Sequence, residues 1–209
     1  MKPILLLDID ATLFDTHKLF HDYIRQALLR LIGTSREDFE TTEKIYKATL
    51  TKATDFDPVA FAHHFASSHQ VETASILALF ATEHWYRNSV FPDVKQMLPR
   101  LSKQYRLGLY SEGSNMYQRQ KIDLGGISNW FDPALTFIFP RKSTPEALNQ
   151  LPATCILVDD KIEYLTTFST SEHRMGIWIN RASDEAHDDF ATIHSFLEIW
   201  DALPLEHQI

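Results

Sequence analysis

Cysteine is almost absent from this chain of 209 residues, in which Cys155 stands alone within an apolar segment. A disulfide needs two cysteines, so no disulfide framework can form within the chain. Disulfides persist mainly in oxidising compartments, and a chain without them is typical of a reducing one. The cysteine content therefore predicts a cytoplasmic protein.

Positive charge is also scarce. Lysine and arginine number 20 against 28 aspartates and glutamates, and the formal net charge is −8. Proteins that bind nucleic acid present a basic face to the phosphate backbone, so this balance argues against a nucleic-acid partner. An anionic substrate would have to be held by local groups and a metal ion rather than by the field of the whole protein.

Long apolar runs are missing as well. No segment approaches the roughly 20 residues that a membrane-spanning helix needs, so we expect no membrane partner. The first apolar run ends at Asp8, too early for the apolar region of a secretory signal peptide. The length suits one domain, or one domain with a modest insert.

The stretch from Ile4 to Thr16 combines an apolar run with two acidic residues. Residues 4–7 are apolar in succession, as in a strand buried on both faces. Asp8 and Asp10 follow and point the same way, because side chains on a strand repeat every two residues. Taken alone, the pair is either the start of a polar loop or a site where a shared proton or a hard cation relieves the repulsion.

Helical patterns then follow one another with no strand between them. Apolar residues on one face end at Gly33, a typical helix stop. Thr34 with Glu37 resembles a capping box, and Asp57-Pro58 is a typical helix start. The helices are expected to cover residues 17–32, 34–50, 58–65 and 73–86, an insert of roughly 70 residues that is small for a free-standing domain.

The remainder alternates helices with strands, which predicts a parallel sheet with right-handed crossovers. Further strands are expected over residues 107–110, 134–139, 154–158 and 175–179. Helices are expected over residues 93–101, 115–124, from 144 onward, and 188–202. Ligands bind such sheets at the carboxyl ends of the strands. The polar groups at four of these ends are Asp8 with Asp10, Ser111, Lys142, and Asp159 with Asp160.

These groups suit one kind of chemistry. Several carboxylates at one edge form an oxygen-rich site for a hard divalent cation, most plausibly Mg²⁺. Ser111 lies at a strand-to-helix turn where its hydroxyl and nearby amides could hold anionic oxygens, and Lys142 adds a positive charge. A carboxylate nucleophile with a cation, a hydroxyl and a lysine describes phosphoryl transfer through an aspartyl-phosphate.

Four motifs in this order carry a family resemblance. They are Asp8-Ile9-Asp10-Ala11-Thr12-Leu13 with Asp15, Leu109-Tyr110-Ser111, Lys142 with Pro145-Glu146, and Leu157-Val158-Asp159-Asp160. The chain resembles the haloacid dehalogenase (HAD) superfamily, in its phosphatase branch with a helical cap inserted after the first strand. The resemblance implies a Rossmann-like three-layer α/β fold with sheet order 3-2-1-4-5. It also implies a core domain of residues 1–16 and 89–209 and an all-α cap domain of residues 17–88.

The resemblance also implies catalytic roles. Asp8 would be the nucleophile, and Asp10 would protonate the leaving oxygen and then deprotonate the hydrolytic water. Lys142 would neutralise both the phosphate and Asp8. Dehalogenases of this superfamily lack a carboxylate at the position of Asp10, because a halide leaving group needs no proton, whereas ester hydrolysis does.

The remaining implied roles concern ligands. Ser111 would bind the phosphoryl oxygens. Mg²⁺ would be held by Asp8, by the backbone carbonyl of Asp10 and by Asp160, with Asp159 beside it or acting through water. The alternative for Asp159 is a merely solvated neighbour of Asp160.

Two positions depart from the family pattern. Ala11 stands where Gly or Asn is usual, so its turn must avoid a positive φ or accept strain. Glu112 stands where Asn usually follows the Ser or Thr, and a carboxylate there would repel phosphate unless it turns away or pairs with Lys142 or Arg141. Our hypothesis is that Glu112 faces away and offers phosphate only its backbone amide.

Other side chains have simpler interpretations. Lys142 could be an ordinary surface lysine, with Arg141 or Lys121 in its place. His17 and His21 have the one-turn spacing of a metal pair, but no third ligand is evident.

The sequence thus predicts a Mg²⁺-dependent phosphatase acting on a small phosphorylated metabolite, of the sugar or nucleotide phosphate class. A phosphotransferase or mutase would share every catalytic residue. A regulatory or binding protein that kept the fold without turnover is the alternative from another class. The sequence does not identify the substrate or the oligomeric state.

Overall fold

The computed structural model describes residues 2–204 and contains a six-stranded sheet in which all neighbours are parallel. The strand order is β3-β2-β1-β4-β5-β6, so the predicted order 3-2-1-4-5 is confirmed and a sixth strand extends the sheet beyond β5. The strands are β1 (Ile4–Leu7), β2 (Arg106–Glu112), β3 (Thr136–Phe139), β4 (Cys155–Asp159), β5 (Arg174–Ile179) and β6 (Ala191–Ile193).

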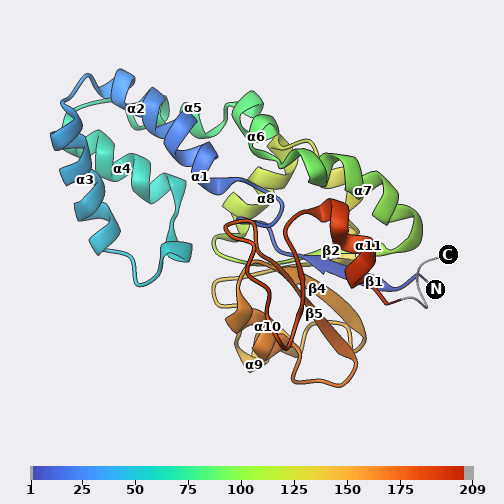
Figure 1. Cartoon of the computed structure of the whole chain (residues 1–209). Helices are drawn as coiled ribbons and strands as arrows, with labels where there is room; N and C mark the ends of the chain where they lie inside the picture. Colours follow the sequence, from blue (N-terminus) through green and yellow to red (C-terminus); the bar gives the residue numbers. More distant parts are fainter. Residues whose placement is uncertain (1, 205–209) are drawn as a thin grey trace.

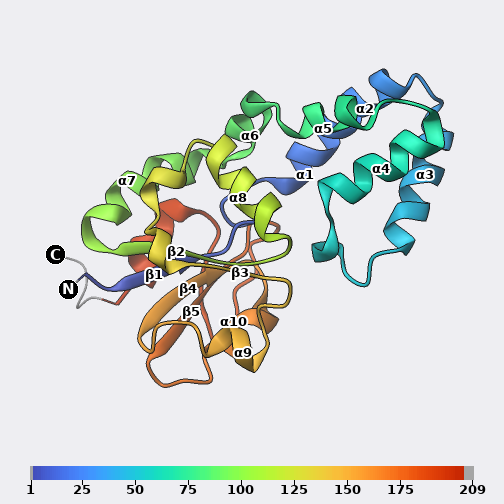
Figure 2. The same cartoon turned by 180° about the vertical axis from the view of Figure 1, so that it is seen from behind.

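Helices cover both faces of this sheet, which gives three layers (Figures 1 and 2). Side chains along β1 alternate between the two faces. Leu5 and Leu7 belong to the apolar cluster that includes Leu98 of α7 (Pro92–Gln104), and Leu6 belongs to the cluster that includes Phe168 of α10 (Ile162–Phe168). Because both faces are buried, β1 has to be apolar throughout. The helices after the insert are α7 (Pro92–Gln104), α8 (Asn115–Leu124), α9 (Pro145–Leu148), α10 (Ile162–Phe168) and α11 (Ile199–Ala202).

A run of helices separates β1 from β2, as expected. Figure 1 shows α2 to α5 gathered on one side of the molecule, away from the helices that cover the sheet. The elements are α1 (Thr16–Lys18), a π-helical turn (Leu19–Ile24), α2 (Arg25–Ile32), α3 (Arg36–Ala48), a 3₁₀ turn (Ala53–Asp55), α4 (Pro58–His69), α5 (Thr73–Phe80) and α6 (Glu83–Ser89). We refer to residues 17–88 as the cap and to the rest as the core; this division into domains stays a prediction.

Several predicted helix ends are confirmed and one is wrong. Gly33 ends α2 in the left-handed conformation, at φ 68°. Asp57 caps α4, because its carboxylate accepts hydrogen bonds from the backbone amides of Val59 and Ala60. The predicted box of Thr34 and Glu37 is displaced by one residue, because Ser35 is the N-cap and accepts from the amide of Asp38.

Two longer predictions are also wrong. The helix expected over residues 73–86 is two helices, α5 and α6, which break at residues 81–82. The closing helix expected over residues 188–202 is replaced by strand β6 and two short helical turns. Ala191–Ile193 pairs with β5, and the carboxylate of Asp93 accepts a hydrogen bond from the Phe196 amide, so both segments are held by distant partners.

Within residues 2–204, no helix is long and apolar enough to cross a membrane.

Candidate active site

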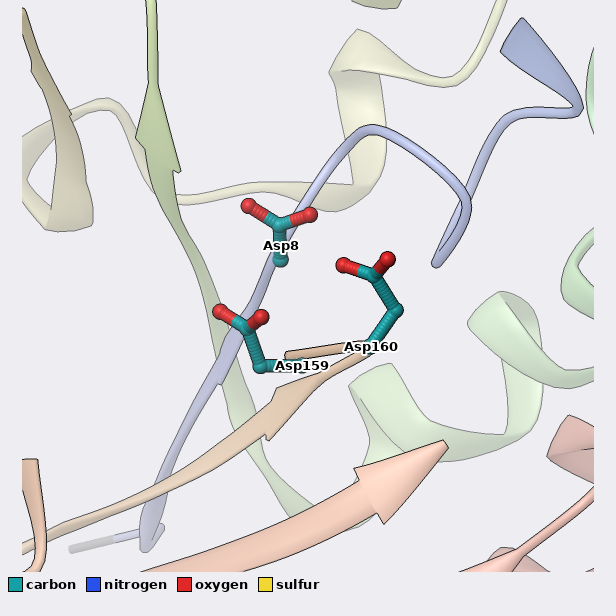
Figure 3. Close-up of side chains that lie close together, drawn as sticks. All are labelled: Asp8, Asp159 and Asp160. Atoms are coloured by element: carbon teal, nitrogen blue, oxygen red, sulfur yellow. The ribbon is translucent and has the colours of Figure 1, made fainter. Parts of the chain in front are cut away.

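Three acidic side chains converge where β1 and β4 end. One carboxylate oxygen from each of Asp8, Asp159 and Asp160 lies within 4.8 Å of the others, and Figure 3 shows the three groups turned toward a common space. Asp8 and Asp159 are buried and Asp160 is half-buried. The register explains the meeting, because β1 and β4 are direct neighbours and the Asp8 amide donates to the Val158 carbonyl.

The electrostatics of this group fit a hard divalent cation. Burial raises the pKa of Asp159 and of Asp160, and the charge of Asp8 raises both further. A cation with oxygen preference would remove that repulsion, and an all-carboxylate donor set suits Mg²⁺. Among the described residues this is the one group of three or more potential ligands. The carboxylate of Asp10 is not part of it, so the predicted ligand role of Asp10 rests on its backbone carbonyl and stays a prediction.

Lys142 supplies the positive charge beside these acids. Its Nζ lies 2.7 Å from Asp8 Oδ1 and also donates to Asp159 Oδ2, while its side chain is buried. Burial lowers its pKa, but the two carboxylates outweigh burial and raise the pKa well above its ordinary value. The ammonium lies 4.3 Å from the centre of the Tyr164 ring. The alternative of an ordinary surface lysine is therefore wrong.

Asp10 is held by donors that sequence reasoning did not assign to it. Lys121 Nζ lies 2.5 Å from Oδ1, Thr16 Oγ1 donates to the same oxygen at 2.6 Å, and Gln118 Nε2 donates to Oδ2 at 2.7 Å. Burial raises the pKa of Asp10, but these donors, Lys121 foremost, outweigh burial and lower it. Gln118 and Lys121 lie three residues apart on α8, a spacing that puts them on one helix face. That spacing is the feature of the sequence that could have indicated a common partner for Gln118 and Lys121.

Ser111 lies in β2 with its hydroxyl buried. Among the described residues, none forms a hydrogen bond with Ser111 Oγ. The hydroxyl of Thr12 is also buried and also has no hydrogen-bond partner among them. Buried polar atoms nearly always have a partner, so these two need a ligand or water to complete them. The position agrees with the predicted phosphate-binding role of Ser111, which stays a prediction.

Glu112 is buried and joins the core to the cap. Its carboxylate accepts hydrogen bonds from Thr54 Oγ1 at 2.9 Å and from the Lys142 amide at 3.0 Å, and Lys52 Nζ lies 3.7 Å away. The ion pair within 4 Å is therefore with Lys52 of the cap, whereas Lys142 contributes its backbone amide and Arg141 interacts with Glu112 only through the longer-range attraction of the two charges. Whether its own backbone amide serves phosphate stays a prediction.

Arg141 makes a second link between core and cap. Its guanidinium donates two hydrogen bonds to the carboxylate of Asp55, at 2.6 and 2.9 Å. This pairing lowers the pKa of Asp55 to about 2. Residues 52–55 of the cap therefore contact the core through Glu112, which Lys52 and Thr54 meet, and through Arg141, which pairs with Asp55.

Ala11 adopts the conformation that its side chain disfavours. Its φ is 58°, so of the two predicted possibilities it accepts a positive φ rather than avoiding it. The turn is closed by hydrogen bonds from the Ala11 amide to the Phe14 carbonyl and from the Leu13 and Phe14 amides to the Ile9 carbonyl.

A cavity of about 540 Å³ lies between cap and core. His17 and His21 line it with their rings stacked 4.3 Å apart, centre to centre, and belong to no larger group of potential metal ligands among the described residues. Its lining side chains belong to Asp10, Thr16, His17, Phe20, His21, Tyr46, Lys47, Leu50, Thr51, Lys52, Ala53, Thr54, Phe56, Phe61, Ser114, Tyr117, Gln118, Lys121 and Lys161.

The sheet order and the acidic strand ends are those of a HAD-like α/β fold, and solved structures agree. A haloacid dehalogenase-like hydrolase from Burkholderia xenovorans LB400 superposes with a TM-score of 0.76, at 16% identity over 100% of this chain and 99% of that chain. The magnesium-bound HAD-hydrolase YfnB from Bacillus subtilis superposes with a TM-score of 0.65, at 12% identity over 96% and 97%. A HAD phosphatase from Thermococcus onnurineus gives 0.62, at 20% identity over 96% and 97%.

The same fold occurs in solved L-2-haloacid dehalogenases. No family model matches the chain. No curated protein matches it either. At these identities the comparisons establish the HAD-like fold, and the chemistry has to be argued from the site.

Proposed function

We propose that this chain is a Mg²⁺-dependent hydrolase of small phosphomonoesters that works through an aspartyl-phosphate on Asp8. The observation that carries the proposal is a second carboxylate, that of Asp10, which lines the cavity. Asp10 follows Asp8 by two residues, and Asp8 is buried in an ion pair with Lys142. A halide leaves without a proton, whereas an alkoxide needs one. Asp10 with the Lys121 ammonium 2.5 Å away provides a group that can exchange that proton.

The residues divide the work as follows. An Asp8 oxygen attacks phosphorus while the bond to the ester oxygen breaks. Asp10, whose pKa is lowered, passes that oxygen a proton drawn from the Lys121 ammonium 2.5 Å away, and the proton that water later gives to Asp10 restores the ammonium. Water then loses a proton to Asp10 and attacks the same phosphorus, which frees Asp8 and inorganic phosphate. The Ser111 hydroxyl and the Lys142 ammonium hold the phosphoryl oxygens. Asp8, Asp159 and Asp160 would hold Mg²⁺, which offsets the negative charge of the phosphoryl group.

The test is phosphate release from a panel of sugar, nucleotide and aryl phosphates, with Mg²⁺ and with EDTA. We expect metal-dependent release that Asp8→Asn reduces at least about a thousandfold, because the amide is not a nucleophile. The matched control is Asp22→Asn, which changes an exposed cap aspartate and should leave the rate unchanged.

Two results would overturn the proposal. One is the absence of metal-dependent phosphate release by the intact protein across the whole panel. The other is halide release from 2-haloacids at a rate that exceeds every phosphatase rate, which would place the chain with the dehalogenases that share its fold.

A further inference from the structure

Five phenylalanine and tyrosine side chains line the cavity between cap and core. Phe20, Tyr46, Phe56 and Phe61 line it from the cap, and Tyr117 lines it from α8 of the core. The same cavity reaches Asp10, so it opens directly onto the proposed proton donor. Its volume of about 540 Å³ is within the range of small-molecule sites and leaves room for more than a phosphate group.

These rings form a connected wall. The Phe56 centroid lies 5.3 Å from that of Phe61 and 5.6 Å from that of Tyr117, and Phe20 meets both phenylalanines at 5.8 Å. Phe61 and Tyr117 are buried, whereas Phe20 and Phe56 remain half-buried. Separations and tilts of this kind are those of favourable aromatic pairs. A further ring placed in the cavity would meet partners already arranged in that geometry.

The polar side chains of the lining that lie around Asp10 are engaged in hydrogen bonds. Thr16 donates to Asp10 and Thr54 donates to Glu112. The Gln118 amide nitrogen donates both to Asp10 and to the Glu112 carbonyl. Gln118 Oε1 is the acceptor in this group that no described residue fills. Along the aromatic wall the hydroxyl groups of a bare sugar would face rings, and hydroxyls left unpaired there cost binding energy.

From this wall we propose that the substrate is a phosphomonoester whose alcohol portion carries an aromatic ring, and that Phe20 and Phe56 contact this ring in the cavity. This inference rests on the proposed phosphatase function and narrows it: an aryl-bearing phosphate, such as a nucleotide, is the substrate class, and a simple sugar phosphate is not.

Two pairs of esters with matched leaving groups test this by turnover. 2-Phenylethyl phosphate and glucose 6-phosphate are both primary alkyl esters, and adenosine 5′-monophosphate and ribose 5-phosphate share the same ester oxygen. Burial of a ring predicts kcat/KM higher by about ten- to a hundredfold for the ring-bearing member of each pair. Phe20→Ser should reduce that ratio about tenfold, and Ile45→Ser, an exposed cap position outside the cavity, should leave it unchanged.

Calorimetric binding of two non-hydrolysable probes separates the inference from the proposed function. The affinity for 3-phenylpropylphosphonate should exceed that for propylphosphonate about tenfold or more, and Phe20→Ser should remove most of the difference. If neither ester pair is hydrolysed but the ring still adds this affinity, the phosphatase proposal is wrong and the aromatic site stands. If both members of each pair are hydrolysed equally, or the ring adds no affinity, the inference is overturned.

Discussion

Replacement of Lys142 by methionine would show how much the buried charge group depends on one cation. Lys142 is buried between Asp8, at 2.7 Å, and Asp159. Methionine has a similar length but no charge, so both carboxylates would remain buried without their partner. Removal of one member of a buried ion pair typically costs about 3–5 kcal/mol. We therefore expect K142M to be less stable than the wild type by that amount in the absence of metal.

Urea unfolding followed by circular dichroism measures this loss. With a denaturant slope of about 2–3 kcal/mol per molar urea, the midpoint should fall by about 1.5 M. The matched control is Lys44→Met at an exposed position of α3, which should change the stability by no more than about 0.5 kcal/mol. An unchanged midpoint in K142M would refute the view that Lys142 neutralises the acidic group.

Two further measurements make the cause specific. Adding Asp159→Asn to K142M should recover part of the lost stability, because a neutral amide then replaces an unpaired carboxylate. At equal concentration, Mg²⁺ should stabilise K142M more than the wild type, because the carboxylates of the variant lack the Lys142 ammonium. At a hundred times the dissociation constant of K142M for Mg²⁺, the variant should gain about 2.7 kcal/mol. If the second substitution lowers stability further, the loss comes from packing and not from charge.

Three other predictions concern the backbone and the pH. Ala11→Gly should raise the melting temperature by about 1–2 °C. Glycine relieves the strain energy of the positive φ of 58°, and this gain slightly exceeds the stability lost because glycine gives the unfolded chain more conformational entropy. A lower melting temperature would show that Ala11 is not strained. Gly108→Ala should lower it by about 3–10 °C, because a Cβ there would lie 2.5 Å from the Leu135 carbonyl oxygen; an unchanged melting temperature would show that β2 can shift. Burial, with the charges around it, raises the pKa of Asp160, so without metal the folded state keeps a proton that the unfolded chain releases above about pH 4. The free energy of unfolding in EDTA should therefore fall as the pH rises from about 5 to about 8, and either Mg²⁺ or Asp160→Asn should reduce this fall. An equal fall in the wild type in EDTA, the wild type with Mg²⁺ and Asp160→Asn in EDTA would show that Asp160 is not the group responsible.

The polar strand ends could be predicted because their positions follow from local rules. Apolar runs such as residues 4–7 identify buried strands, and the carboxyl ends of parallel strands meet at one edge. That reasoning placed Asp8 and Asp159 together before any contact was known, and the structure confirms their proximity. The order 3-2-1-4-5 came from the family resemblance and is likewise confirmed.

Two of the wrong predictions have different physical causes. Residues 188–202 have the apolar spacing of an amphipathic helix, but Ala191–Ile193 instead fills the free edge of β5, where backbone pairing outweighs helical propensity. Neither glycine nor proline marks the break at residues 81–82 between α5 and α6. The local signal there is weaker: Thr82, a residue type that favours the N-cap position, precedes α6.

The sequence alone determined which residues stand at the strand ends and which elements carry them, because strand periodicity and strand direction are local properties. Only the tertiary structure decided the partners of those residues. Lys121 binds Asp10 and Glu112 accepts from Thr54 across 111 and 58 positions of chain, respectively. The first contact depends on how α8 packs within the core and the second on how the cap packs against the core, and the spacing of residues along the chain does not encode either packing.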